Sequence, residues 1–263
     1  MESPRTPFRR ALILALPVAA AAGLVLAQTP IPTHYKHPPL DQGRFVIRSG
    51  GKQVGTEDFT FRVLADSLCL SSQSLTLQDP GDGKPDTVDK QLFLSVGKDD
   101  YVLHTYQSNE TFRGNLLVRG IVMGDTLFTL YREYRGHGTG DRLVLPPGRM
   151  YVMDSRLYSL FELMCLSLKD QTFQQRPVLV LALGERDTLV EATLARAGRD
   201  TLRIGGKPTV TTRWRMIQGP VTLELWTDAQ GRLMRVAHPP SGLVVEREPA
   251  AVKPSRPSPK PGG

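Results

Sequence analysis

The chain has 263 residues, of which 40% are hydrophobic and 22% are charged, and its formal net charge is +7. This composition predicts a packed core and excludes a largely disordered chain. Lysines and arginines do not cluster among aromatic residues, so nucleic-acid binding is not expected, and the modest positive charge fits weak attraction to anionic lipid or polysaccharide surfaces.

Residues 1–27 have the pattern of a secretory signal peptide. Three arginines precede an apolar stretch from Ala11 to Leu26, and Ala27 precedes a cleavage site at Gln28. An uncleaved anchor is the alternative, but the apolar stretch contains Pro17 and falls short of the roughly 20 residues that span a bilayer. We therefore expect export to the periplasm or the cell exterior, with no transmembrane span after cleavage.

Residues 28–42 contain four prolines and predict an extended linker, and residues 43–248 predict a single β-rich domain. Alternating polar and apolar residues predict its first strands. These strands are expected at residues 44–49, 53–64, 67–78, 91–96, 101–107, 115–122 and 126–134. Residues 79–89 are expected to form a polar loop, and Gly136, Gly138 and Gly140 a flexible segment.

One helix is predicted, at residues 155–169. Leu157, Leu160, Phe161, Met164 and Leu168 recur at helical spacing, and Asp154 or Ser155 is expected to cap the first turn. Most of the circumference is apolar, so other parts of the protein should cover the helix.

More strands follow the helix, at residues 172–183, 188–196 and 201–204, with hairpin loops expected at residues 184–187 and 198–200. The run Thr209–Glu248 then predicts four strands separated by three turns. Residues 249–263 hold five prolines and three basic residues, and predict a disordered basic tail.

Together these elements predict a mainly β fold: a curved antiparallel sheet, half-barrel or open barrel, with one apolar α-helix packed on its concave side. A strand meander of this length must curl or divide to bury one face. A helix on the concave side would fill that curve.

Three segments carry a resemblance to known proteins: Gly43–Ile47, Gln53–Glu57 and Leu225–Leu233. The pattern resembles secreted bacterial domains of unknown function built on the half-barrel fold of the lipoprotein-localisation carriers (LolA/LolB-like). The resemblance implies an apolar cavity suited to acyl chains, and it implies no catalytic residues. The chain departs from the carriers in having no lipid-attachment cysteine and in its proline-rich tail.

Six residues are candidates for lining a ligand pocket, and packing in the core of a β domain is the alternative for each. They are Trp214, Trp226, Tyr158, Leu160, Phe161 and Met164. Arginines alternate with the tryptophans in the closing strands. They either face solvent or hold an anionic headgroup at the rim.

No metal site, cofactor site or catalytic constellation is predicted. Asp79, Asp82, Asp86 and Asp89 share a glycine-containing loop, but the order of ligands in a calcium-binding EF-hand is not met, and a solvated turn explains the same residues. Known nucleophile, zinc and phosphate-loop motifs are absent from the sequence. A hydrolase assembled from distant residues around His104 or His238 stays open.

Cys69 and Cys165 are either a disulfide or two buried thiols, and the sequence leaves both open. The leading functional hypothesis is an exported, non-enzymatic binding or carrier protein for a lipid-like or other apolar ligand. The alternatives are an envelope interaction module that has a filled core and contacts a cell-envelope protein, and an unrecognised hydrolase.

Overall fold

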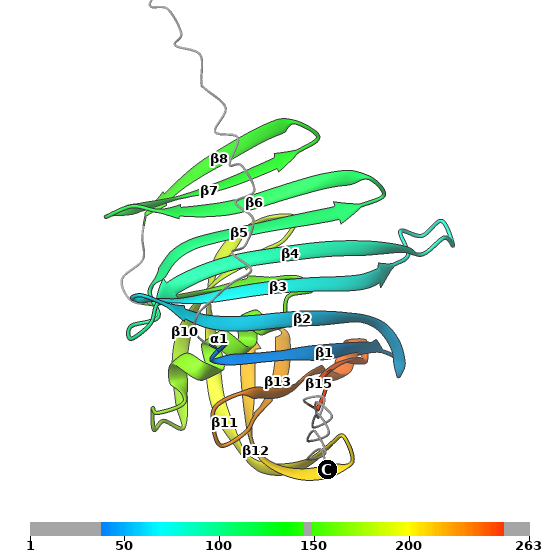
Figure 1. Ribbon diagram of the computed structural model, residues 1–263, viewed down its shortest axis with the longest axis vertical. Coiled ribbons are helices and arrows are strands. Elements are labelled where there is room, and N and C mark those ends of the chain that lie inside the picture. Colours follow the sequence, from blue (N-terminus) through cyan, green and yellow to red (C-terminus); the bar gives the residue numbers. More distant parts are fainter. Residues whose placement is uncertain (1–37, 145–148, 250–263) are drawn as a thin grey trace, which may run out of the picture. The chain divides into compact units, whose positions relative to one another are not determined.

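The computed structural model describes residues 38–144 and 149–249. The predicted signal peptide, most of the predicted linker and the predicted tail from residue 250 lie outside these ranges. No helix within them is long and apolar enough to cross a bilayer. Figure 1 shows long strands stacked beside one another, with α1 seen behind β1 and β2.

The described residues form fifteen strands, one α-helix and one short 3-10 helix. Their bounds are β1 (Asp41–Ser49), β2 (Lys52–Leu64), β3 (Ser67–Gln78), β4 (Asp86–Gly97), β5 (Leu103–Phe112), β6 (Asn115–Met123), β7 (Leu127–Tyr134), β8 (His137–Val144), β9 (Met150–Asp154), α1 (Ser159–Leu168), β10 (Gln175–Leu183), β11 (Thr188–Ile204), β12 (Lys207–Gln218), β13 (Val221–Thr227), β14 (Leu233–His238), η1 (Pro239–Ser241) and β15 (Leu243–Arg247).

All fifteen strands belong to one sheet, in the order β8-β7-β6-β5-β4-β3-β2-β1-β15-β14-β13-β12-β11-β10-β9. Two meanders, β1–β8 and β10–β15, are therefore joined by the antiparallel pairing of β1 with β15. The exception to antiparallel order is β9, which pairs in parallel with β10. Parallel neighbours need a crossover connection, and α1 supplies it.

Alternation along the strands decides which side chains enter the core. In β2, Glu57, Phe59 and Phe61 are buried, while Asp58, between Glu57 and Phe59, is exposed. Its Oδ1 lies 2.7 Å from Nε of Arg44 on β1. The main core gathers inward side chains from both meanders, so the sheet must curl around it. Its most deeply buried members include Phe45, Phe61, Leu70, Leu94, Ile121, Leu181, Leu225 and Val245.

Helix α1 fills the concave side of this curved sheet, which confirms the predicted fold class. Nine of its ten residues are buried, and Phe161 is half-buried against the same core. A helix enclosed in this way needs partners for its polar atoms within the protein, because an unpaired buried polar group is costly.

Glu57 of β2 supplies the partner for the start of the helix. Its carboxylate accepts bonds from the backbone N–H of Tyr158 (2.5 Å) and of Ser159 (3.2 Å), and from the hydroxyls of Ser159 and Ser72, each at 2.6 Å. The expected cap, Asp154 or Ser155, is wrong, since α1 begins only at Ser159 and no side chain of its own first turn caps it. Burial raises the pKa of Glu57, against the effect of these hydrogen bonds.

Arg247 of β15 pairs with an acid in the first turn of the helix, Glu162. Its Nη1 lies 2.8 Å from Oε1 of Glu162, and its Nη2 lies 2.7 Å from Oδ1 of Asp41. Two acids thus share one arginine in the interior. Burial is the main reason that the pKa of Glu162 lies well above its usual range, and the hydrogen bond with Asp41 raises this pKa further. Burial also acts to raise the pKa of Asp41, but Glu162 and Arg247 outweigh it and hold that pKa lower.

A third buried polar cluster joins strand β9 to strands β4 and β5. Asp154 lies 2.6 Å from Nζ of Lys90 on β4 and accepts bonds from the hydroxyls of Tyr106 (2.5 Å) and Ser108 (3.2 Å) on β5. Lys90 also pairs with Glu110 at 3.0 Å. Burial, reinforced by Asp154, raises the pKa of Tyr106. Breaking one partner of such a pair would leave a buried charge uncompensated.

Several predicted boundaries are corrected. Gly138 and Gly140 of the segment expected to be flexible lie in strand β8, and Gly136 lies in the turn before it. The end of the polar loop at 79–89 belongs to β4. Strand β9 was not expected. The predicted hairpin loop at 198–200 lies within the single continuous strand β11.

We expect the stability that depends on Glu162 to fall as the pH rises. A pKa that is higher in the folded state contributes stability that is complete below the unfolded value, near 4.5, and is lost as the pH rises through the folded value. Glu162→Gln mimics the protonated acid. The unfolding free energy of the native chain relative to this variant should therefore decrease as the pH rises above about 4.5 in denaturant titrations.

Glu246→Gln, which removes a carboxylate paired with Arg48 on the outer face, is the matched control. A difference between native and Glu162→Gln protein that stays constant or grows with pH would contradict the assignment.

Candidate functional site

The helical residues predicted to line a pocket lie in or against the main core. Leu160 is 1% exposed and Met164 0%, while Tyr158 and Phe161 are half-buried with their rings stacked at 6.4 Å. In the described structure their neighbours are other core side chains. An acyl chain at these residues would have to displace the helix.

The two tryptophans lie on opposite faces of the sheet. Trp214 of β12 packs against the main core, whereas Trp226 of β13, 5% exposed, belongs to a second cluster with Leu202, Ile204 and Met234. Their indole N–H groups donate to different partners, Trp214 to Thr227 and Trp226 to Asp200, each at 3.1 Å. The predicted set therefore does not converge on one pocket.

A β-bulge in β11 creates the site that the structure favours. The register with β12 shifts between Arg196, which opposes Trp214, and Gly198, which opposes Arg213. Ala197 is the extra residue. In a regular strand, residues 196 and 199 would point to opposite faces. The inserted residue brings Arg196 and Arg199 onto the same inner face, because a bulge re-aims the side chains that follow it.

Gly198 makes the bulge possible. Its φ is +120°, a backbone conformation that residues with a Cβ atom rarely adopt. Beyond it the buried apolar residues of β11, Leu202 and Ile204, face the second cluster instead of the main core. One glycine thus marks the point where the strand changes the face that it buries.

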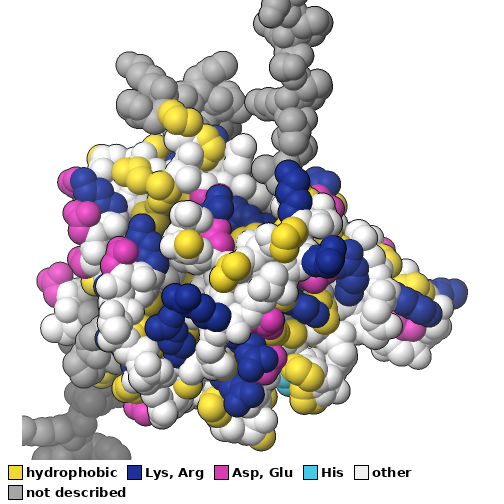
Figure 2. All heavy atoms as spheres, turned by 90° about the horizontal axis from the view of Figure 1, so that it is seen from below, with side chains coloured by type: hydrophobic (Ala, Val, Ile, Leu, Met, Phe, Trp, Pro, Cys, Tyr) yellow, Lys and Arg dark blue, Asp and Glu magenta, His cyan; other side chains and the backbone are white. Residues whose placement is uncertain are grey.

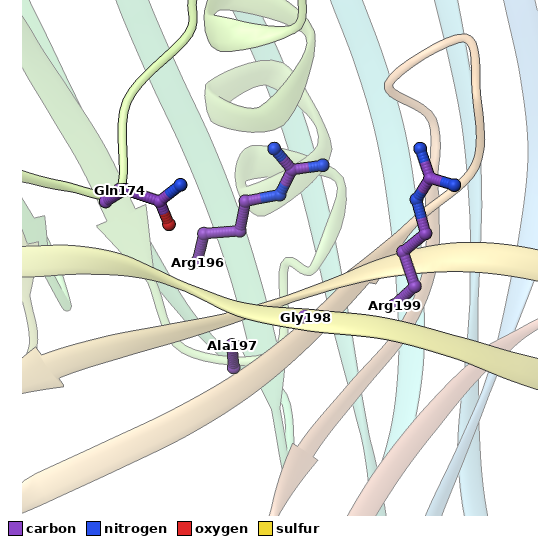
Figure 3. Close-up of a pocket in the computed structure, with 5 residues that line it drawn as sticks. All are labelled: Gln174, Arg196, Ala197, Gly198 and Arg199. Carbon is purple, nitrogen blue, oxygen red and sulfur yellow. The ribbon is translucent and has the colours of Figure 1, made fainter.

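The bulge opens into a hollow of about 450 Å³ lined by Gln174, Arg196, Ala197, Gly198 and Arg199. Figure 3 shows the guanidinium groups of Arg196 and Arg199 extending to the same side of the strand, with the amide of Gln174 beside Arg196 and the methyl group of Ala197 turned the other way. The backbone N–H of Arg196 donates to the carbonyl of Gln174 at 2.8 Å, which fixes the loop against the bulge.

Two aromatic rings lie beside the hollow, and one of them is in contact with Arg196. The guanidinium of Arg196 lies 6.0 Å from the ring centre of Trp214, whose ring lies 5.3 Å from that of Phe173. Within the described ranges, neither Arg196 nor Arg199 has a carboxylate partner. Two exposed guanidinium groups without a counter-charge form a site that attracts an anion such as a carboxylate, phosphate or sulfate.

The other arginines of the closing strands face outward and pair with acids. Arg215 lies 3.6 Å from Glu224, and Arg235 lies 3.8 Å from Glu246. Arg215 and Arg235 therefore lie on the outer side of the sheet, as the first of the two alternatives for the arginines of the closing strands expects.

The remaining candidates have local partners. Asp82 pairs with Arg113 at 2.7 Å, and no group of three or more metal-ligating side chains occurs in the part of the chain that the structure describes. His104 and His238 are each near a serine hydroxyl, of Ser67 at 3.4 Å and Ser241 at 2.8 Å, at exposed positions. Within 38–144 and 149–249, neither imidazole is bonded to a carboxylate as in a hydrolase triad.

Cys69 and Cys165 are both free and buried. Burial raises the pKa of both thiols, and Glu162 adds to the effect at Cys165. These are the properties of packing residues, since reactive cysteines need a lowered pKa.

Comparison with known proteins supports the fold. No family model matches the sequence, and no curated protein matches it. A crystal structure from Brucella abortus, described as a β-barrel-like protein of the domain of unknown function DUF1849, matches with a TM-score of 0.53 and 7% identity over 79% of this chain and 94% of that chain. The likeness shows a β-barrel-like fold alone; the closer resemblance to the lipoprotein carriers stays a prediction.

We expect Gly198→Ala to destabilise the protein by about 1–3 kcal/mol, the usual cost of a side chain held at a strained φ. Gly138→Ala in β8 is the matched control, because both positions have open space for a methyl group and only Gly198 has a positive φ. The control should change stability by less than about 0.5 kcal/mol. Equal costs in denaturant unfolding would show that the bulge conformation does not depend on this glycine.

Proposed function

We propose that the protein is an exported, non-enzymatic binding protein that holds the anionic group of its ligand in the hollow of Arg196 and Arg199. The observation that carries this proposal is the bulge, which places two arginines without acidic partners on one face around a hollow. β-Bulges are over-represented beside active sites, where they re-aim side chains.

The buried charged clusters are a poorer candidate for the site. Glu57, Glu162 and Asp154 each bond groups that fix the helix or strand β9. Their partners account for them without a ligand. The hollow, in contrast, is exposed to solvent and its arginines have no acidic partner within the described ranges.

The apolar ligand implied by the carrier resemblance fits this site less well than an anion. The concave side is filled by α1, and the predicted lipid-contacting residues Leu160 and Met164 are buried in the core. An anionic lipid could place its headgroup in the hollow, with its chains against Phe173 and Trp214 at the edge of the core. The shared chemistry of the ligand is the anionic group.

The test is calorimetric titration of the purified chain with pyrophosphate and with citrate. Arg196→Ala and Arg199→Ala should each weaken binding about tenfold or more, since a charge-assisted hydrogen bond contributes about 1.5–3 kcal/mol. Arg213→Ala is the matched control, because this arginine opposes Gly198 but faces the outer side of the sheet. Absence of binding, or equal losses in all three variants, would overturn the proposal.

An envelope interaction module is the second candidate, and strand β8 favours it. Among the described strands β8 pairs with β7 alone, all its residues are exposed, and Val144 is 72% exposed. An exposed edge strand can pair with an extended segment of another protein. Leu143→Lys with Val144→Lys should preserve the fold and abolish cross-linking of the chain to envelope proteins. Unchanged cross-linking would exclude this edge as the interface.

A further inference from the structure

A row of arginines continues from the hollow along the inner face of β11. Alternation after the bulge puts Arg199, Thr201 and Arg203 on one face of the strand. The other face carries Leu202 and Ile204, which are buried in the second cluster. Arg203 opposes Pro208 near the tip of the hairpin and is exposed. Four residues of strand separate Arg199 from Arg203, or about 13 Å.

This face is open in the described structure. Val210 of β12, which opposes Thr201, is 65% exposed, and Arg199 and Arg203 are exposed as well. Neither arginine has an acidic partner among the described residues. Figure 2 looks onto the molecule from below, the end where β11 and β12 lie in Figure 1, and shows basic side chains recurring across it.

The rest of the chain does not offer a counter-charge for this row. Residues 1–37, 145–148 and 250–263 contain one acidic residue, Glu2, while the last of these segments carries three basic residues. Like charges repel, so the C-terminal segment is a poor occupant of an arginine row. The row is therefore open to a negatively charged ligand.

We propose that the ligand of this face is a linear anionic polysaccharide that runs along β11 from Arg196 through Arg199 to Arg203. The inference rests on the proposed function and names its ligand class. A single small anion cannot reach both ends of the row, whereas a chain with repeated carboxylates or sulfates can. Thr201 and Thr212, which flank the arginines on the same face, offer hydroxyls for the sugar oxygens.

The row of arginines fits an anionic sugar chain better than it fits single-stranded nucleic acid or an anionic membrane. Single-stranded nucleic acid is held by aromatic side chains on which its bases stack. Trp214 instead lies between Arg196 and Phe173, with no other aromatic residue in the strands of the row, β11 and β12. A planar bilayer would meet outward surfaces first, and the arginines lie on the inner face.

The test is the dependence of affinity on ligand length, with galacturonate oligomers from one to eight units titrated into the full chain. Affinity should rise at least tenfold from the monomer to the octamer and then level off for polygalacturonate. Arg203→Gln should abolish this gain and lower the salt dependence of octamer binding by about one unit of slope. The same variant should bind pyrophosphate like the native chain. Arg213→Gln on the outer face is the control.

The outcomes separate the two proposals. Loss of pyrophosphate binding in Arg196→Ala with no length dependence would keep the anion site and overturn the polysaccharide. Tighter binding of single-stranded DNA of equal charge, or binding to vesicles containing phosphatidylglycerol but not to the octamer, would also overturn it. Failure of every probe to bind would overturn both proposals.

Discussion

The burial of α1 inside the curved sheet is the constraint on which the rest of the structure depends. A helix covered on every side cannot give its polar atoms to water, so the sheet must bond them. Glu57 of β2 accepts hydrogen bonds from the amides at the start of the helix, and Arg247 of β15 pairs with Glu162 in its first turn. These two strands flank β1 in the sheet, so the helix is fixed at the junction of the two meanders. The consequence for function is that the concave side is already occupied by the protein itself.

Because the interior is filled, the site that we propose lies where the regular sheet is interrupted. The bulge at Ala197 interrupts β11 where it leaves the main core, and the strand beyond it buries its other face against Trp226. Beyond the bulge, the inner face of β11 does not pack against the main core, and it carries Arg199 and Arg203. The same backbone irregularity therefore accounts for the second apolar cluster, the hollow and the row of unpaired positive charges.

Much of the fold follows from the sequence, because alternation along strands and helical spacing are local signals. Phe59 and Phe61 predict the buried face of β2, and Leu160 and Met164 predict the buried face of the helix. The partners of the helix could not be predicted in this way. Glu57 is about a hundred residues from Ser159, and only folding brings the carboxylate to the amide. Strand β9 was missed because its residues are buried on both faces and do not alternate.

The site was missed for a different reason. Gly198 lies between two alternating runs, which predicts a turn, although a bulge produces the same pattern. The apolar residues on either side, Ala192 and Leu194 before it and Leu202 and Ile204 after it, all have even numbers, so counting along the sequence suggests a single buried face. The change of face is visible only in the pairing of β11 with β12. Arg196 and Arg199 become neighbours through that pairing, and nothing local to either residue predicts it.

The measurement that tests the account most directly is hydrogen–deuterium exchange of the α1 amides in the full chain, with and without added lipid. If the helix is a permanent part of the core, residues 159–168 exchange as slowly as β2 and β3, through global unfolding, and lipid does not change the rate. Fast exchange of the helix in the absence of ligand, or a marked change when lipid is added, would show that α1 leaves the concave side, and would return the ligand to the interior of the sheet.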